Sequence, residues 1–139
     1  MFDDERSLLH CRFLYEMSAD RHSSGIELEA DRYPHYFSAL AEGLFLAADD
    51  AQTDPNTNEF TDGYLKPLGI TSMLDAPMRR GDDVIGVVCH EHIGPGRHWM
   101  PDEREFAAAV AHFVDHALEV QRRRDAEENA RQAQVRLLE

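Results

Sequence analysis

The chain has 139 residues, of which 42% are hydrophobic, and it carries a formal net charge of −13. This length fits one domain with a short appendage, and the apolar share is enough for an ordinary core. No apolar run is long enough to cross a membrane, and the acidic N-terminus does not resemble a signal peptide. The negative charge argues against nucleic-acid binding, because phosphate contacts need clustered Lys and Arg. We therefore expect a cytoplasmic protein without a nucleic-acid or membrane partner.

Charge is distributed unevenly along the chain. Residues 121–139 hold five of the 14 Lys and Arg residues but only four of the 27 Asp and Glu residues. We therefore divide the chain into a globular domain over residues 1–120 and a polar C-terminal helical extension over residues 121–139. Cys11 and Cys89 do not form a CxxC motif, and buried free thiols of a cytosolic protein are the simplest explanation for them.

The N-terminal part predicts strands, a loop and a short helix. Residues 1–2 are predicted to be the end of a strand, and residues 8–16 alternate apolar and polar side chains as a half-buried strand does. The polar residues 18–29 are predicted to be a loop. A short helix is expected to follow Asp31 and to stop at Gly43.

A short strand and a second helix are predicted before the centre of the chain. Residues 44–48 are an apolar run typical of a strand, and turn-forming residues follow them. Asn56 and Glu59 have the spacing of a capping box, which predicts a helix start at this point. This helix is expected to run through Tyr64 and to end at Gly69.

Residues 70–92 predict the β-hairpin around which the fold is organised. Residues 70–78 are mostly apolar, and the following turn contains Gly81, which tolerates a positive φ. Residues 84–92 are rich in β-branched side chains and apolar on both faces, as in a strand that is covered on both sides. A hairpin of this kind lies near the middle of a sheet.

The longest predicted element is a helix that starts near Pro101. Apolar residues recur in it with helical spacing and form a stripe: Phe106, Ala109, Val110, Phe113, Ala117 and Val120. The opposite face carries Glu105, His112, Asp115, His116 and Glu119. Residues 121–139 keep strong helix formers but nearly lose apolar residues. Because burial cannot stabilise such a polar helix, we expect it to pair with a copy of itself as a coiled coil and to lead to another domain.

Four sequence blocks, in this order, resemble a GAF domain: DDAQTDP, YLKPLGITSMLDAPM, VIGVVCHEH and W-x-P-D-E-x-x-F. The resemblance covers roughly residues 7–120 and is to the type found in bacterial sensor histidine kinases and diguanylate cyclases. It implies an α+β fold, an α/β sandwich with a GAF-like central antiparallel β-sheet, helices on both sides and a long C-terminal helix. It also implies a sensory module, in which helices on one face often form the dimer and short helices and loops on the other can close over a small ligand.

The N-terminus departs from the family pattern. Family members begin with a helix and a first strand inside the sheet, and only residues 1–2 correspond to them here, so the resemblance implies an N-terminally truncated domain. Residues 8–16 and 84–92 would then expose unpaired backbone groups, each of which costs about 1–3 kcal/mol when buried. Three arrangements would satisfy these groups: direct pairing of the two segments, a strand donated by a second chain, or stacking of the edge against a copy of itself. We expect direct pairing, because it needs no partner.

The candidate reactive residues argue against catalysis. His90, His92 and His98 lie close in sequence and could hold a metal, but solvated or hydrogen-bonded histidines at a strand end explain them better. Cys89 and His90 are adjacent on a strand, so their side chains point to opposite faces and cannot form a nucleophile pair. We expect no enzymatic activity, no catalytic residue and no metal, and the sequence identifies no cofactor.

The expected pocket lies on the face of residues 84–92 that carries Ile85, Val87, Cys89 and Glu91. On the other face, Gly86 leaves room for the C-terminal helix to pack closely. The ligand-pocket candidates are Tyr64, Ser72, Cys89 and Glu91. The dimer-helix candidates are Phe106, Val110, Phe113, Ala117 and Val120.

The leading hypothesis is a non-enzymatic GAF-type sensory module of a bacterial signal-transduction protein, for example of a two-component system. It would bind a small cytoplasmic ligand and relay binding through the C-terminal helix, by a difference in affinity between two helix arrangements. We expect a homodimer, with the downstream signalling domain outside this chain. The alternative is a ligand-free dimerisation scaffold for a histidine kinase or diguanylate cyclase. A filled interior favours the scaffold, and a roomy pocket with convergent polar groups favours the sensor.

Overall fold

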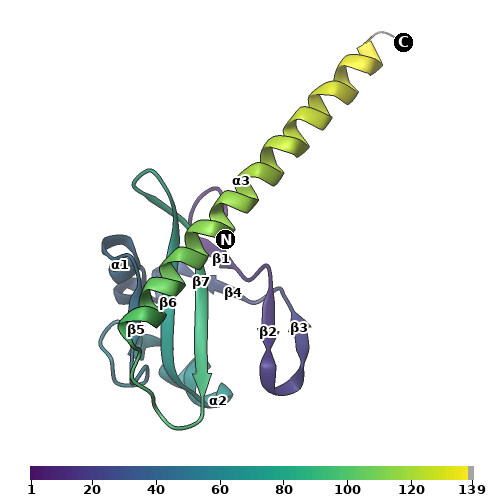
Figure 1. Ribbon diagram of the computed structural model, residues 1–139. Helices are drawn as coiled ribbons and strands as arrows, with labels where there is room; N and C mark the ends of the chain where they lie inside the picture. The colour runs from purple at the N-terminus through teal and green to yellow at the C-terminus, as the bar shows by residue number, and fades with distance from the viewer. Residues whose placement is uncertain (138–139) are drawn as a thin grey trace.

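The computed structural model describes residues 1–137 and is an α+β sandwich around a three-stranded antiparallel sheet. The sheet has the order β5-β6-β7, with strands β5 (Leu46–Ala48), β6 (Ile70–Arg80) and β7 (Asp83–Ile93). The main helices are α1 (Pro34–Glu42) and α3 (Pro101–Leu137). They pack on opposite faces of the sheet, and α3 continues far beyond it (Figure 1). The predicted fold class is therefore confirmed.

Shorter elements complete the domain. Two small sheets pair β1 with β4 and β2 with β3; the strands are β1 (Leu8–His10), β2 (Leu14–Glu16), β3 (Arg21–Ser23) and β4 (Glu27–Glu29). Single helical turns flank them, namely η1 (Met17–Ala19) and η2 (Ala30–Arg32). Three short helical segments connect β5 to β6: η3 (Asn58–Phe60), the π-helical η4 (Thr61–Leu65) and α2 (Lys66–Leu68).

The predicted central hairpin is confirmed, and Gly81 adopts a φ of 63° in its turn. The strand register shifts between Met78 and Arg79, as at a β-bulge. Ile85 consequently packs on the α3 side of the sheet, whereas Val87 packs on the α1 side. The prediction that Ile85 shares the pocket face is therefore wrong, because a bulge interrupts the simple alternation of side chains along a strand.

Gly86 is buried, but the space beside it is not used by α3. A Cβ atom at this position would lie 2.6 Å from Met78 Cε and 2.7 Å from Met1 Sδ. The two methionine side chains therefore fill the room that was expected for the helix.

α1 begins at Pro34, a residue suited to the first helical turn because it lacks the N–H that would be unpaired there. The next two backbone N–H groups donate to the carboxylate of Glu59, both at 3.2 Å. The helix ends before Gly43, as predicted. The capping box predicted from Asn56 and Glu59 is wrong, because Glu59 serves the start of α1 and the segment that follows it is a series of irregular turns.

Arg79 of β6 holds the other end of α1. Its Nη2 donates to the backbone carbonyls of Leu40, Ala41 and Gly43 at 2.7, 2.9 and 2.7 Å. Arg79→Ala is expected to lower the free energy of unfolding by about 1–3 kcal/mol, because these carbonyls lose a charged donor at the helix C-terminus. Urea denaturation measures the loss, and Arg79→Lys, which keeps the charge, should lose less. An unchanged stability of Arg79→Ala would contradict this role.

Residues 8–16 do not form one strand, and residues 18–29 are not a loop. The two halves of the first segment, β1 and β2, pair with strands β4 and β3 of the second. The β2–β3 hairpin stands apart from the rest of the domain in Figure 1. Phe13 beside it is 69% exposed and Tyr15 is 47% exposed, so the alternating pattern does not mark a buried face here.

Residues 1–2 were predicted to be the end of a strand, but only Phe2 forms an isolated β-bridge, with Leu9, and the two residues lie between β7 and β1. The Met1 ammonium group donates to the His10 carbonyl at 2.8 Å, and the His10 N–H donates back to the Met1 carbonyl at 2.9 Å. On the other side, the Phe2 N–H donates to the Ile85 carbonyl at 3.0 Å. The expected direct pairing of residues 8–16 with residues 84–92 is therefore wrong. Beyond these two residues, β7 has no strand on its outer side within the described part of the chain.

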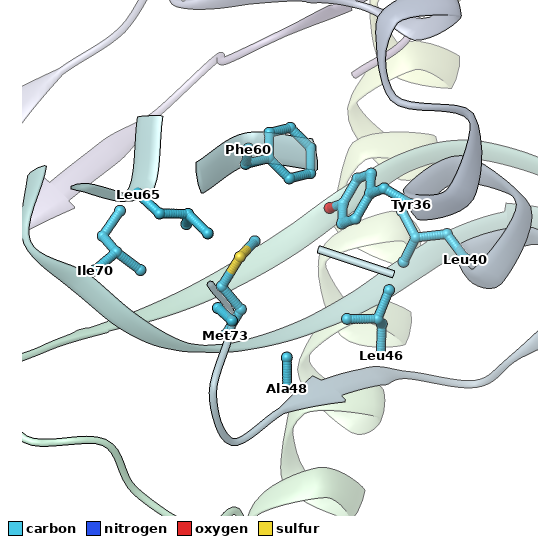
Figure 2. Close-up of a cluster of buried hydrophobic side chains, with 9 residues drawn as sticks. Tyr36, Leu40, Leu46, Ala48, Phe60, Leu65, Ile70 and Met73 are labelled. Carbon is cyan, nitrogen blue, oxygen red and sulfur yellow. The ribbon is translucent and has the colours of Figure 1, made fainter. Parts of the chain in front are cut away.

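Each face of the sheet carries a hydrophobic cluster. The cluster on the α1 side contains Tyr36, Leu40, Leu46, Ala48, Ala51, Phe60, Leu65, Ile70 and Met73. The side chains that Figure 2 labels point toward one another. The cluster on the α3 side contains Leu74, Ala76, Met78, Trp99, Ala107 and Ala111. Strand β6 contributes to both clusters, which explains why it is apolar almost throughout.

The face of α3 that packs on the sheet is not the predicted stripe. Ala107 and Ala111 are each 1% exposed, with Val114 packed beside them. Phe106 and Phe113 lie about a quarter turn away around the helix and are 64% and 71% exposed. The stripe is therefore available for another contact. None of the helices within residues 1–137 has the length and apolar character needed to span a membrane.

The polar side of α3 also contacts the domain. Arg80, next to the hairpin turn, has Nη2 3.6 Å from an Asp115 carboxylate oxygen and 3.2 Å from one of Glu119. These two acids, predicted opposite the stripe, therefore connect α3 to β6. The helix continues to Leu137, and every residue from 121 to 137 is exposed.

Candidate functional site

Buried polar groups gather on the α1 side of the sheet, where β6 and β7 are paired. Asp75 of β6 is 0% exposed and lies opposite Cys89 in the ladder. The hydroxyl of Tyr36, from α1, donates to Asp75 Oδ2 at 2.5 Å. The other carboxyl oxygen, Oδ1, is buried and has no hydrogen-bond partner within residues 1–137. Such an atom is unusual, because native proteins pair nearly all of their buried polar groups.

A second tyrosine–carboxyl pair involves Glu91 of β7, which lies two residues beyond Cys89. Tyr64 of η4 directs its hydroxyl at Glu91, with oxygen–oxygen distances of 2.9 and 3.1 Å. Cys89 and Glu91 share a face of β7 because side chains alternate along a strand. The carboxylate–tyrosine cluster, as we name it, consists of Tyr36, Tyr64, Asp75, Cys89 and Glu91.

Burial dominates the electrostatics of this cluster. It raises the pKa of Asp75 to about 7. The Tyr36 hydrogen bond opposes the shift, the nearby Glu91 adds to it, and the Cys89 thiol and the His90 backbone N–H close to the carboxyl group oppose it further. Burial also raises the pKa of Glu91, opposed by the Tyr64 hydrogen bond. None of the ion pairs within residues 1–137 includes Asp75 or Glu91. The two carboxyl groups therefore have no cationic partner in the described protein.

The cluster reaches the surface at Cys89. This residue is exposed, so the prediction of a buried thiol is wrong for it, although the thiol is close to the buried carboxyl group of Asp75. Access to the cluster is therefore expected from the outer edge of β7.

The structure brings together three of the four predicted ligand-pocket residues: Tyr64, Cys89 and Glu91. Ser72 is not part of the cluster. Its hydroxyl donates to the Asp49 carbonyl at 2.7 Å and accepts a hydrogen bond from the Arg97 backbone N–H at 3.0 Å. It fastens the segment before α3 to β6.

Sequence reasoning missed Asp75 and Tyr36, which complete the cluster. The available signal was an acidic residue in the middle of an otherwise apolar strand, since a buried charge needs a partner or a function. Tyr36 could not be found in this way, because it is 39 residues from Asp75 in the sequence and only the fold brings the two together.

The apolar interior beside the cluster is lined by buried side chains that point toward one another (Figure 2). The Phe60 ring stacks on Tyr33 with a centroid distance of 4.1 Å and meets Tyr36 edge-on at 4.9 Å. Two surface grooves lie elsewhere, one between β7 and the start of α3 and the other beside α1 and β5. Neither groove is lined by a member of the cluster.

The histidines that were considered for a metal site have separate partners. These are the Leu74 carbonyl for His90 at 2.9 Å, the Pro95 carbonyl for His92 at 3.0 Å, and the Asp49 carboxylate for His98. Within residues 1–137, no three side chains of His, Cys, Asp or Glu are placed so that they could hold a metal ion.

Comparison with known families identifies the chain. The family model for the GAF domain matches residues 2–118, which is most of the sequence. The chain belongs to the GAF domain family. No curated protein matches it.

Solved structures with the same fold include cyanobacteriochrome GAF domains. The receptor PixJ has 18% identity and a TM-score of 0.56, with 81% of each chain covered. The blue-light absorbing form of the Thermosynechococcus elongatus PixJ GAF domain has 17% identity and a TM-score of 0.54, with 86% of this chain and 79% of that one covered. A far-red cyanobacteriochrome photoreceptor has 15% identity and a TM-score of 0.52, with 81% and 75% covered. At these identities the similarity concerns the fold.

Proposed function

We propose that this GAF domain is a non-enzymatic sensory module of a bacterial signal-transduction protein. It binds a small cytoplasmic molecule at the carboxylate–tyrosine cluster and passes the change to α3. The observation that carries the proposal is the buried Oδ1 atom of Asp75, which has no partner within residues 1–137. An unsatisfied buried polar group costs about 1–3 kcal/mol, and a ligand with a hydrogen-bond donor would remove that cost. The photoreceptor GAF domains of similar fold are in keeping with a sensory role.

Strand β6 offers a direct connection from the cluster to α3. Asp75 faces the cluster, whereas its neighbours Leu74 and Ala76 pack in the hydrophobic cluster that contains Ala107 and Ala111 of α3. A ligand can move α3 only if it binds one arrangement of β6 and α3 more tightly than another. The exposed residues 121–137 then act as the linker helix toward an output domain, for which a histidine kinase or diguanylate cyclase is our proposal.

Native mass spectrometry of the protein as purified tests ligand binding. We expect a bound small molecule on the wild type and its loss from Asp75→Asn, which removes the charge of the free acceptor. Asp115→Asn on α3 changes the net charge equally and should retain the molecule. A wild-type mass equal to that of the bare chain would contradict the sensor and favour the alternative function.

That alternative is a ligand-free dimerisation scaffold for a histidine kinase or diguanylate cyclase. The buried side chains that pack together on the α1 side favour it (Figure 2). A scaffold would use the same exposed helix as a sensor. The two proposals differ only in whether the cluster holds a molecule.

Both functions predict a homodimer through α3. The stripe of exposed and half-buried residues repeats at intervals of four and three, as in a coiled-coil seam: Phe106, Val110, Phe113, Ala117 and Val120. Phe113→Glu is expected to convert a dimer to a monomer, because the charge would be buried in an apolar interface. Light scattering at micromolar concentration measures the change. Phe13→Glu, at a similarly exposed aromatic residue outside the helix, should remain dimeric, and a monomeric wild type would contradict the proposal.

A further inference from the structure

The carboxylate–tyrosine cluster has more hydrogen-bond acceptors than donors. A tyrosine hydroxyl carries one hydrogen, whereas an ionised carboxylate can accept about four hydrogen bonds. The Tyr64 hydroxyl is the one donor that both Glu91 oxygens share, and the Tyr36 hydroxyl reaches only Oδ2 of Asp75. Oδ1 receives no hydrogen bond within residues 1–137. A molecule that complements the cluster must therefore supply donors.

The charge of the cluster also has no internal counterpart. Arg79 lies on the same strand as Asp75 and is the basic residue nearest to it in sequence. Its guanidinium group already donates to three backbone carbonyls at the end of α1. The ring of His90 donates to the Leu74 carbonyl. The whole chain is acidic, with a net charge of −13, so a positive charge is what the site lacks.

Aromatic rings lie beside the two carboxyl groups. The rings of Phe60 and Tyr64 meet edge to face with centroids 6.3 Å apart, and Phe60 also contacts Tyr36. Aromatic faces attract cations through the ring quadrupole, and they also pack against apolar groups that are attached to a cation. The surroundings of the acids therefore suit a cation, and an apolar body attached to it would lie at the outer edge of β7, because the aromatic rings on the inner side pack against one another.

We infer that the cluster binds a small molecule with a cationic donor head group, of the amine, amidine or guanidine class, through Asp75 and Glu91. The inference rests on the proposed sensory function and specifies its ligand. An anion would meet two carboxyl groups and no cation. A neutral amide would supply donors but leave the charge uncompensated. A proton alone would satisfy Asp75 but would add no donor for Glu91.

The test uses three ring compounds of nearly equal shape: benzamidine, which is cationic, benzamide, which is neutral, and benzoate, which is anionic. Isothermal titration of the full chain at pH 8 should show binding of benzamidine, at least tenfold weaker binding of benzamide, and none of benzoate. Asp75→Asn and Glu91→Gln should each weaken benzamidine binding by about tenfold or more, because a charge-assisted hydrogen bond is lost. Asp115→Asn, which removes the same charge on the α3 side, should bind benzamidine like the wild type.

Three results would overturn the inference. The first is benzamide or benzoate binding as tightly as benzamidine. The second is equal benzamidine affinity in Asp75→Asn, Glu91→Gln and Asp115→Asn, with circular dichroism showing that all three fold. The third is no binding of benzamidine together with a pH-dependent stability that Asp75→Asn abolishes, which would make the cluster a protonation site only. A neutral or anionic molecule found by native mass spectrometry would reject the ligand class and leave the sensory function standing, whereas a bare chain would reject that function itself.

Discussion

Trp99→Ala is expected to lower the free energy of unfolding by about 3–5 kcal/mol, as truncation of a buried tryptophan generally does. Trp99 is 6% exposed and belongs to the hydrophobic cluster on the α3 side. Its Nε1 donates to the Ala48 carbonyl at 3.3 Å, and its backbone N–H donates to Asp49 at 2.9 Å. The residue therefore joins the end of β5 to the segment that leads into α3.

Urea denaturation followed by circular dichroism measures the loss. Trp99→Phe is the matched control, because it keeps an aromatic ring but cannot donate to Ala48, and it should lose clearly less stability than the alanine variant. If Trp99→Ala lowers the free energy of unfolding by less than about 1 kcal/mol, the surrounding side chains refill the space that the ring leaves. That result would contradict the role of Trp99 in connecting β5 to the segment before α3.

Asp75→Asn is expected to change how stability depends on pH. The pKa of Asp75 is raised from its ordinary value of 3.8 to about 7 in the folded protein, mainly by burial. The folded state therefore holds the proton more tightly than the unfolded state. This contribution to stability is complete below about pH 4 and is lost as the pH rises through 7. The asparagine variant cannot titrate, so it should gain stability relative to the wild type between pH 4 and pH 7, at a rate of up to about 1.4 kcal/mol per pH unit.

The measurement is the difference in urea stability between the variant and the wild type at pH 5 and pH 8. Subtraction removes the effect of surface carboxylates such as Glu119, whose pKa is lowered to about 2 by hydrogen bonds from Arg122 and Arg123. A carboxylate with a lowered pKa contributes stability that is lost as the pH falls. This contribution is the same in the variant and in the wild type. A difference that does not change with pH would show that Asp75 is ionised in the folded protein at pH 5 as well.

Hydrophobic periodicity predicted the elements that bury a face, namely the central hairpin, β5, α1 and α3. It failed where large apolar residues are not the ones that pack. On α3 the pattern is dominated by Phe106 and Phe113, yet the contact with the sheet is made by Ala107 and Ala111, whose small size lets the helix approach closely. Around β2 the alternation of Phe13 and Tyr15 is that of a buried strand, but none of the other elements within residues 1–137 covers these two side chains. A sequence pattern does not record whether a covering element is present.

Strand alternation could predict which of the candidate pocket residues lie side by side. Cys89 and Glu91 share a face, and Tyr64 from the preceding helical segment meets Glu91. Short-range patterns misled in two places. Glu59 has capping-box spacing but caps a distant helix, and Ser72 serves the loop before α3 instead of the pocket. In both cases a polar side chain finds its partner across the fold, which no local pattern records.

The length of α3 beyond the sheet gives it mechanical leverage. Its last closely buried residue is Ala111, and the helix continues to Leu137, about 39 Å farther along its axis at 1.5 Å per residue (Figure 1). A tilt of about 10° at Ala111 would displace Leu137 by about 7 Å, given that rise per residue. In the proposed sensor, a rearrangement of β6 that tilts α3 by this amount would move the far end of the helix by more than one helical turn.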